Sequence, residues 1–482
     1  MKIALINPRV ETYSSSLPPL GLLYIGAALE KENFEVLIFD PLPNADQDIQ
    51  KIIDFQPDIV GISLLTTYLN RAKHIISMLK QNLKSCFFVI GGIHSTVLPE
   101  ESLDFLGADC AVIGEGESTM KDLCLRLKER RTFEDVKGLA YREKGQIIKT
   151  EPRQPIKDLD ELLFPARHLI DFEKYIFPPG VLRGYWSQRC TSLMTSRGCP
   201  FQCIWCGTQA IFGQKVRRRS IENVIKEIEL LQKDFRIDTI WFIDDTFTLD
   251  RKWVLGLCER MIEKGISLKW GCQAHVTTID EEMVSRMKKA GLVQLDFGVE
   301  SGSERVLKAL KKGSSEEAIK KAFRITKNLG IRRVATFMFG NPEEEEEDVK
   351  KTFKLAREIK PDFASSFFLT PFPGTKLMEM AKNKGWLRSR DYSGGGLKKE
   401  PMMQINFSPE RLRKIRKKFQ LQFLWSNYIR QFLNLRYLSN ALFLVMQYPI
   451  GILKGIRVFV KTGVFDDCIF AFLIYYAGKK QK

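Results

Sequence analysis

Histidine is scarce in this chain, which has only four among its 482 residues: His74, His94, His168 and His275. A closed structural zinc site normally takes four Cys or His ligands. The clustered cysteines Cys199, Cys203 and Cys206 have no fourth Cys or His close downstream. Zinc and three unrelated thiols stay open as alternatives, but the scarcity of ligands disfavours zinc.

A long apolar run is also missing. The longest apolar stretch, residues 441–453, is interrupted by Gln447 and Pro449 and is shorter than the roughly 20 residues of a membrane-spanning helix. The N-terminal sequence MKIALINP enters an apolar strand without the h-region and cleavage site of a signal peptide. The other cysteines show no disulfide framework. We therefore expect a cytoplasmic protein in a reducing compartment.

Acidic residues are absent from one long segment. Residues 411–465 contain eleven Lys or Arg, no Asp or Glu, and interleaved large apolar residues such as Trp425 and Phe459, in a chain of net charge +17. Amphipathic helices of this composition lie in membrane interfaces, whereas a helical cap over the preceding domain would leave the basic face in solvent. We favour peripheral contact of residues 411–482 with the inner face of the membrane. No RNA-binding module is recognisable, so we expect no nucleic-acid partner.

The strongest chemical signal is the stretch TSRGCPFQCIWCG, residues 195–207. Its C-x3-C-x2-C spacing places Cys199, Cys203 and Cys206 on one short loop, and thiolates are the usual ligands of iron–sulfur clusters. Three sulfurs would leave one iron of a four-iron cluster open to another ligand. Gly198 lets the backbone turn tightly, and Pro200 fixes φ after the first ligand. We predict a 4Fe-4S cluster here.

Short apolar strands alternate with helices over residues 1–150. We expect strands at 2–6, 35–40, 59–64, 87–91 and 111–113, with helices at 22–31, 49–55 and 71–81. This alternation predicts an α/β, doubly wound (Rossmann- or flavodoxin-like) parallel sheet covered on both faces. Ligands of such sheets bind at the carboxyl ends of the strands. A domain of this fold that binds nothing is the alternative.

The rest of the chain divides into three regions. Residues 151–185 contain five prolines and are predicted to be a linker with a short helical patch at 159–163. Residues 186–400 resume the alternation, with strands at 191–196, 239–243, 268–274, 293–299, 334–339 and 363–369. Six βα units predict a partial TIM-like barrel with its active site at the strand carboxyl ends. Residues 401–482 are predicted to form a basic, amphipathic helical region.

The loop that carries the three cysteines, residues 199–206, is called the cysteine loop. Its C-x3-C-x2-C spacing after a strand resembles the radical S-adenosylmethionine (SAM) superfamily. In that superfamily the open iron chelates SAM, and an electron from the cluster cleaves it to a 5′-deoxyadenosyl radical. Residues 1–150 resemble the cobalamin-binding domain of many members, because Ser63-Leu64-Leu65 is similar to their S-x-L motif and Gly91-Gly92 to their paired glycines. No D-x-H-x-x-G follows the first strand, so no His is expected to ligate cobalt from below.

The resemblance, which is to the anaerobic porphyrin cyclase and P-methylase group, also implies binding residues. Those implied for cobalamin are Asn7, Leu20, Gly21, Ser63, Leu65, Thr66, Gly91, Gly92, Gly114 and Glu115. Those implied for SAM are Phe201, Asp244, Gln273, Glu300, Ser301 and Gly340. Asp244 could instead cap the next element. Relatives often carry Arg near the third barrel strand end, where this chain has Ala274-His275, so the partner of the SAM carboxylate and the catalytic residues are unassigned.

These features together imply a cobalamin-dependent radical SAM enzyme that functionalises an unactivated carbon. We favour methyl transfer to a small, lipophilic substrate, with an electron donor such as flavodoxin or ferredoxin. A cyclase or carbon–carbon bond-forming enzyme with the same cofactors is the alternative. A membrane-associated cobalamin or redox sensor is an alternative of another class, but a sensor has no need of a SAM pocket.

Overall fold

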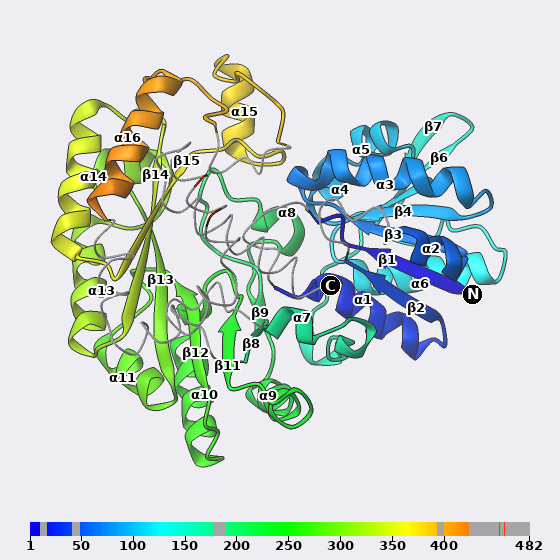
Figure 1. Ribbon diagram of the computed structural model, residues 1–482, viewed down its shortest axis with the longest axis horizontal. Coiled ribbons are helices and arrows are strands. Elements are labelled where there is room, and N and C mark those ends of the chain that lie inside the picture. Colours follow the sequence, from blue (N-terminus) through cyan, green and yellow to red (C-terminus); the bar gives the residue numbers. More distant parts are fainter. Residues whose placement is uncertain are drawn as a thin grey trace.

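The computed structural model describes residues 1–9, 17–40, 49–176, 189–392, 400–423, 453 and 457. Two helix-covered sheets lie side by side, one built from the N-terminal third of the chain and the other from the middle (Figure 1). Most of the segment expected at the membrane, residues 424–482, lies outside the described residues.

The first sheet has the flavodoxin-like strand order β2-β1-β3-β4-β5, extended by β6 and β7. Its strands are β1 (Lys2–Ile6), β2 (Glu35–Phe39), β3 (Ile59–Ser63), β4 (Phe87–Gly91), β5 (Cys110–Val112), β6 (Leu139–Glu143) and β7 (Gln146–Lys149). The first five are parallel, while β6 and β7 form an antiparallel hairpin at one edge. The predicted doubly wound sheet is confirmed, and the hairpin is an addition to it.

Both faces of this sheet are buried because alternate residues of each strand pack on opposite helix layers. In β1, Ile3 and Leu5 join the core beneath α1 and α6, whereas Ala4 and Ile6 join the core beneath α2, α3 and α5. The helices are α1 (Leu20–Lys31), α2 (Ile49–Phe55), α3 (Leu69–Asn82), α4 (Ile93–Val97), α5 (Pro99–Leu106) and α6 (Gly116–Lys128). A strand buried on both faces needs the near-continuous apolar sequence seen here.

The second sheet has six parallel strands in chain order, β8-β11-β12-β13-β14-β15. They are β8 (Cys190–Leu193), β11 (Thr239–Phe242), β12 (Lys269–Ala274), β13 (Leu292–Glu300), β14 (Arg332–Phe339) and β15 (Phe363–Phe368). The covering helices are α9 (Ile221–Phe235), α10 (Arg251–Glu263), α11 (Glu281–Lys289), α13 (Glu316–Asn328), α14 (Glu346–Ile359) and α15 (Lys376–Asn383). This arrangement confirms the predicted partial barrel.

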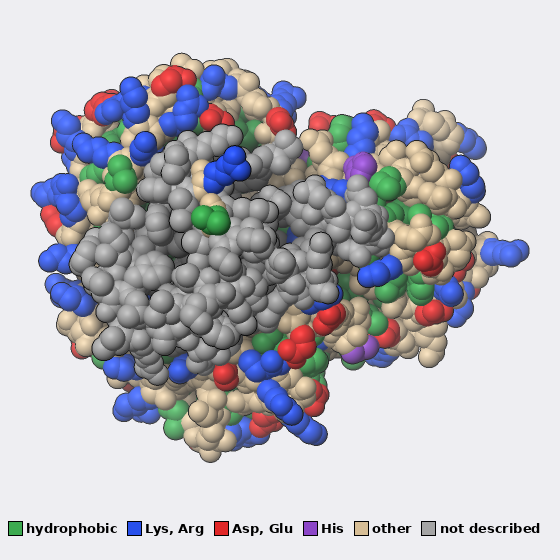
Figure 2. All heavy atoms as spheres, in the orientation of Figure 1, with side chains coloured by type: hydrophobic (Ala, Val, Ile, Leu, Met, Phe, Trp, Pro, Cys, Tyr) green, Lys and Arg blue, Asp and Glu red, His purple; other side chains and the backbone are tan. Residues whose placement is uncertain are grey.

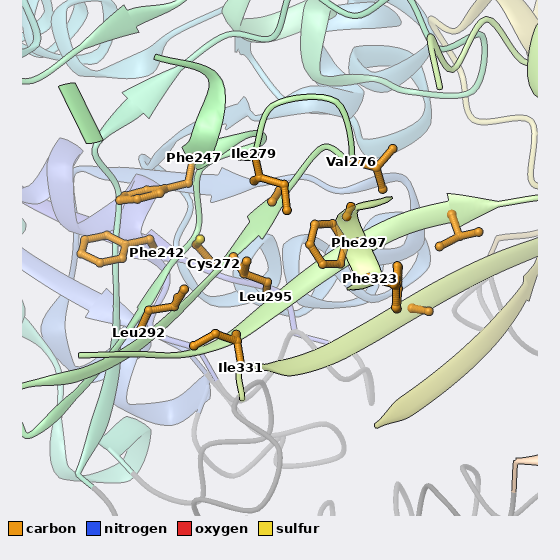
Figure 3. Close-up of a cluster of buried hydrophobic side chains, with 14 of the residues drawn as sticks. Phe242, Phe247, Cys272, Val276, Ile279, Leu292, Leu295, Phe297, Phe323 and Ile331 are labelled. Carbon is orange, nitrogen blue, oxygen red and sulfur yellow. The ribbon is translucent and has the colours of Figure 1, made fainter. Parts of the chain in front are cut away.

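The barrel core lies between its strands and its outer helices (Figure 3). Phe242, Phe247 and Phe297 are completely buried in it. Side-chain caps fix where the helices begin, as when the Ser220 hydroxyl accepts a hydrogen bond from the Asn223 backbone N–H at the start of α9. Such a cap contributes about 1 kcal/mol. Core and caps together hold the strand carboxyl ends, where the candidate site lies, in fixed positions.

Short elements that the sequence did not predict surround the cysteine loop. They are β9 (Ser196–Arg197), α8 (Thr208–Phe212), β10 (Arg217–Arg218) and α12 (Glu304–Ala309), and another short helix, α7 (Glu173–Ile176), packs beside β8. The strands β9 and β10 pair antiparallel just before and after the loop. Figure 1 shows α8 and β9 at the junction of the two sheets.

Helix α16 (Pro409–Gln422) packs on the barrel rather than presenting an apolar face to a membrane. Phe419 is 0% exposed, and its ring lies 4.9 Å from that of Phe337 and 5.2 Å from that of Phe353. Phe423 belongs to the same core. Our interpretation of residues 411–423 as membrane-contacting is therefore wrong, because most of their apolar side chains, those of Leu412, Ile415, Phe419 and Phe423, are buried against the barrel. No helix among the described residues is long and apolar enough to cross a bilayer.

Candidate active site

The cysteine loop is hydrogen-bonded to two later segments of the barrel, one just after α12 and the other in α15. The Ile204 backbone N–H donates to the Leu310 carbonyl at 3.2 Å, and the Ile204 carbonyl accepts from Leu377 at 2.8 Å. Gly198 adopts φ +99°, and a Cβ there would lie 2.5 Å from the Lys215 carbonyl oxygen. Only glycine therefore permits the loop to turn so close to the strand that follows it.

The loop supplies a donor set that fits a 4Fe-4S cluster by type. Cys199 and Cys203 are half-buried, Cys206 is exposed, and all three are free thiols. As placed, no three His, Cys, Asp or Glu side chains of the described residues converge to hold a metal ion. The fit thus rests on the number and chemistry of the thiols and on the anchored backbone that carries them.

Asp244, which lies just after β11, binds the segment that leads into the cysteine loop. Its carboxylate accepts hydrogen bonds from the Thr195 backbone N–H at 3.1 Å, from the Thr195 hydroxyl at 2.8 Å and from the Ser196 hydroxyl. The residue is 1% exposed, and burial raises the pKa of its carboxyl. Asp244 therefore holds the β8–β9 connection and caps no helix, so its expected contact with SAM stays a prediction.

Glu300, expected at SAM, pairs with a cation that the sequence did not single out, Lys312, and Phe201, also expected at SAM, is connected to the backbone of the same residue through His275. The Lys312 ammonium lies 3.0 Å from the Glu300 carboxylate and 5.6 Å from the centre of the Trp205 ring. The Phe201 ring stacks at 4.0 Å on His275, whose Nε2 lies 3.0 Å from the Lys312 carbonyl. Aromatic, anionic and cationic groups thus meet beside the cysteine loop.

Burial and nearby charges shift the pKa values of side chains in this group. Burial and the nearby charge of Lys312 lower the pKa of His275 to about 4, so the ring is neutral at pH 7. Burial also opposes the charge of Lys312, but the attraction and hydrogen bond of Glu300, together with the nearby Cys203 and Cys206, outweigh it and raise the pKa of Lys312. Glu300 adopts φ +64°, a strained conformation for a residue with a side chain.

The other expected SAM residues lie at strand ends but face different surroundings. The Ser301 hydroxyl is completely buried, 3.2 Å from the Thr352 hydroxyl of α14. The Gln273 side chain is exposed at the end of β12. The Gly340 turn, at φ +84°, lies beneath Leu412 of α16. Their roles in binding SAM stay predictions.

The residues expected at cobalamin lie along the carboxyl edge of the first sheet. The Leu64 backbone N–H donates to the Gly91 carbonyl at 2.7 Å, so the two motifs are neighbours. Gly92 adopts φ +91°, and a Cβ there would lie 2.8 Å from the Leu64 carbonyl oxygen. Leu65 is 41% exposed at this edge. The edge thus combines closely packed backbone with an accessible apolar side chain, as a large ring ligand requires.

The remaining edge residues have varied partners. The Asn7 amide donates to Asp40 at 3.2 Å, and the buried Thr66 hydroxyl lies 3.2 Å from Nδ1 of His94. Leu20 is buried and Gly21 is exposed at the start of α1, where space is open beside Gly21. Ser63 ends β3, and Gly114 follows β5 at φ +82°. The structure therefore brings these residues to one edge without testing their contacts.

Glu115, expected at cobalamin, instead binds two arginines of the barrel. Its carboxylate accepts from Arg197 at 2.7 Å and from Arg217 at 2.7 Å, while Arg197 also donates to Glu117 at 2.5 Å. None of the four side chains is more than 9% exposed. Burial opposes ionisation, but the bonds from Arg217 and Arg197 lower the pKa of Glu115. We call these four residues the interdomain ion network.

Two arginines face each other in this network. Arg197 and Arg217 are directly opposite on β9 and β10, an arrangement that like charges disfavour. The two glutamates from the β5–α6 region supply the compensating charge. The cysteine loop, which begins two residues after Arg197, is thereby fastened to the carboxyl edge of the first sheet.

Close apolar contacts complete the junction. A Cβ at Gly207 would lie 2.8 Å from Ile93 of α4, and one at Gly374 would overlap Val97 of the same helix. Glycine at both positions lets the barrel loops pack directly on α4. At Gly374 an added Cβ would lie 2.8 Å from the Val97 Cβ, so the loop or α4 would have to move, whereas at Gly207 the contact is with the flexible end of Ile93, which can turn aside.

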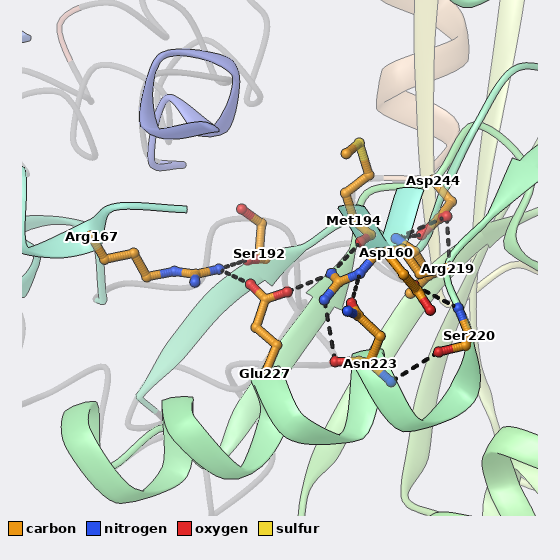
Figure 4. A network of polar contacts seen from close by, with 10 residues as sticks. Asp160, Arg167, Ser192, Met194, Arg219, Ser220, Asn223, Glu227 and Asp244 are labelled. Carbon is orange, nitrogen blue, oxygen red and sulfur yellow. Dashed lines mark hydrogen bonds and ion pairs between the residues drawn. The ribbon is translucent and has the colours of Figure 1, made fainter. Parts of the chain in front are cut away.

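A second buried network ties the predicted linker to the barrel (Figure 4). Arg167 and Arg219 donate to different oxygens of Glu227 at 2.6 and 2.5 Å, and Glu227 is 0% exposed. The Ser220 backbone N–H donates to Asp160 at 2.9 Å. The segment that contains Asp160 and Arg167 is therefore bound to α9 and does not run free between the sheets.

Comparisons with known proteins identify the families to which the two parts of the chain belong. The model of the radical SAM superfamily matches residues 193–356, and that of the B12 binding domain matches residues 6–124. An uncharacterised methyltransferase of Pyrococcus horikoshii is 34% identical over 433 residues, which are 88% of this chain and 92% of that protein. The anaerobic magnesium-protoporphyrin IX monomethyl ester cyclase of Rubrivivax gelatinosus is 30% identical, over 80% of this chain and 70% of that protein.

A solved structure shows the same fold. The cobalamin-dependent SAM radical enzyme OxsB, with aqua-cobalamin and SAM bound, matches with a TM-score of 0.72 at 18% identity, over 100% of this chain and 79% of that chain. A doubly wound sheet joined to a cysteine-bearing partial barrel defines a class of radical enzyme with two cofactor domains. This chain belongs to the radical SAM superfamily and carries a B12 binding domain. Its cofactors are a 4Fe-4S cluster, SAM and cobalamin.

Replacing Gly92 should impair cobalamin binding. Gly92→Ala places a methyl group against the Leu64 carbonyl, so the edge must shift, and we expect corrinoid affinity to fall at least about tenfold, the equivalent of 1.4 kcal/mol. Gly145→Ala is the matched control, because Gly145 has a similar φ of +81° but lies in open space at the β6–β7 turn. Corrinoid absorbance after desalting measures both variants, and equal retention would contradict the assignment.

Removing Arg217 should destabilise the junction. Arg217→Ala leaves Glu115 with less compensation in a buried site, and breaking such a pair typically costs about 3–5 kcal/mol. Arg251→Ala is the control, because Arg251 pairs with Asp280 at the surface with its side chain 48% exposed, and we expect a loss below about 1 kcal/mol. Urea unfolding measures both. A similar small loss in the two variants would mean that the network contributes little.

Proposed function

We propose that the enzyme transfers a methyl group to an unactivated carbon of a small, lipophilic substrate. The observation that carries the proposal is the interdomain ion network, which fastens the cysteine loop to the carboxyl edge of the first sheet through Glu115 and Arg197. Methyl transfer requires the two cofactor sites to face one substrate. A direct connection between them supports a reaction that uses both.

The residues beside the cysteine loop are suited to orienting SAM. When bound, the cofactors supply the radical that removes a hydrogen atom and the methyl group that replaces it. Lys312 is the cation that we propose for the SAM carboxylate, because it is 12% exposed beside Cys203 and no Arg follows β12. Glu300 can then accept from the ribose hydroxyls or the ammonium group of SAM. The Phe201–His275 stack offers an apolar platform.

The two sheets are proposed to bind different cofactors. We propose that residues 1–150 bind cobalamin, that residues 186–400 bind the cluster and SAM, that residues 151–185 connect them, and that residues 401–482 form a basic helical region. The enzyme would work in the cytoplasm with an external electron donor. The Rubrivivax relative, which is named for its action on magnesium-protoporphyrin IX monomethyl ester, also favours an apolar substrate.

Cyclisation is the second candidate. The same relative is a cyclase and is 30% identical to this chain, whereas the Pyrococcus relative is a methyltransferase and is 34% identical. Both reactions begin with removal of a hydrogen atom, so the same site residues serve either. Methyl transfer and cyclisation differ in the group that reacts with the substrate radical. The structure of the product identifies that group.

The decisive experiment follows a labelled methyl group. The full chain, with cluster and cobalamin loaded anaerobically, is given SAM with a deuterated methyl group and a lipid extract from a deletion strain. We expect a lipid that is present in the parent strain to appear with the label, carrying a CD3 group in place of one hydrogen atom of its precursor. A product lacking two hydrogens and the label would replace methyl transfer by cyclisation. The variant with Cys199, Cys203 and Cys206 changed to Ala is the inactive control.

We also propose that residues 424–482 contact the inner face of the membrane, because they combine basic and large apolar residues. Full-length protein should float with anionic vesicles at low salt and less at high salt, since salt screens the attraction. A chain ending at residue 423, which keeps α16, is the control and should stay at the bottom of the gradient. Full-length protein that never floats would refute the contact.

A further inference from the structure

A basic hollow lies against the cysteine loop. It has a volume of about 610 Å³ and is lined by Gln202 of the loop, by Arg305 and Lys308 of α12, and by Lys311 and Gly313 just beyond that helix. Gln202 stands between two of the three cluster cysteines in the sequence. The hollow therefore opens beside the group that must be reduced for the proposed reaction.

The positive charge in this hollow is largely unpaired. Lys308 and Lys311 are exposed, and neither makes an ion pair with another described residue. Arg305 is held by Asp348 at 2.5 Å. Glu304, the acid in the wall, accepts from the Glu316 backbone N–H at 2.6 Å, at the start of α13. Two solvated ammonium groups thus dominate the charge of the hollow.

The wall of the hollow and the cysteine loop are in direct contact. The Ile204 N–H donates to Leu310, which ends α12, at 3.2 Å. A Cβ at Gly313 would lie 3.7 Å from the Phe201 ring. A partner seated in the hollow would therefore touch residues adjoining the loop without displacing either cofactor domain.

We propose that this hollow is the docking face for a small acidic electron-carrier protein. The inference rests on the proposed function, which requires one electron per SAM cleaved and names no internal source for it. One electron leaves the donor, the cluster gains it, and no bond forms or breaks in that step. Exposed lysines hold a small anion weakly, but they steer a partner that carries many negative charges.

Lys and Arg are spread over the barrel surface (Figure 2), so the proposal must be separated from a general effect of charge. The test variant is Lys308→Glu combined with Lys311→Glu. The matched control is Lys226→Glu combined with Lys233→Glu, which makes the same charge change at exposed residues of α9. That helix lies beside β8 at one end of the sheet, whereas α12 follows β13 (Figure 1).

Cluster reduction is followed by absorbance in the holoenzyme, with reduced flavodoxin or with dithionite as the donor. At low salt the test variant should be reduced by flavodoxin about tenfold more slowly than the parent, within the range of electrostatic steering. The control variant should change little. Dithionite needs no docking face and should reduce all three proteins equally. Added salt should slow the reduction of the parent protein by flavodoxin, and it should decrease the difference in rate between the parent and the test variant.

Each other outcome has a defined meaning. Equal flavodoxin rates in the test and parent proteins would overturn the proposal, as would equal slowing of the two charge variants. A raised KM for substrate with unchanged flavodoxin rates would assign the hollow to an acidic substrate instead. If dithionite also fails with the test variant, Lys308→Gln combined with Lys311→Gln takes its place, with a smaller expected decrease. Failure of dithionite with the parent protein would refute the proposed function rather than the docking face.

Discussion

The buried ion network between Glu115, Glu117, Arg197 and Arg217 is the constraint on which the arrangement of the two sheets depends. Four charges held away from water are costly unless each has its partner in place. The cross-strand pair of arginines would destabilise the pairing of β9 with β10 without the glutamates. The network therefore forms only when the carboxyl edge of the first sheet contacts the cysteine loop. It makes the docking of the two domains specific.

The strained Glu300 and the buried Lys312 show how the site is prepared before any ligand arrives. A positive φ in a residue with a side chain is unfavourable and persists only where its surroundings enforce it. Here the irregular register between β13 and β14 at Gly298 and Glu300, together with the ion pair to Lys312, holds that conformation. Site groups fixed by packing do not have to be ordered at the moment of binding.

The sequence predicted the architecture well, because its signals are local. Apolar strands, amphipathic helices and the C-x3-C-x2-C spacing each lie within a short window, and both sheets formed as expected. The residues whose roles the sequence did not predict depend on contacts between distant parts of the chain. Lys312 follows Lys311 in what reads as a solvated charge run, and Arg197 lies 82 residues from Glu115. Phe419 reads as part of a basic amphipathic segment, yet the barrel buries it completely. Only tertiary contacts decide such positions.

The packing of Gly207 and Gly374 on α4 bears on how freely such enzymes can exchange parts. Because the barrel loop at Gly374 leaves no room for an added Cβ beside Val97, the two domains are closely matched where this loop meets α4. A chimera that combines the corrinoid domain of one relative with the barrel of another would inherit both mismatched charges and mismatched contacts. Recombination between relatives should therefore succeed only when α4, the β5–α6 turn and the cysteine loop are transferred as one unit.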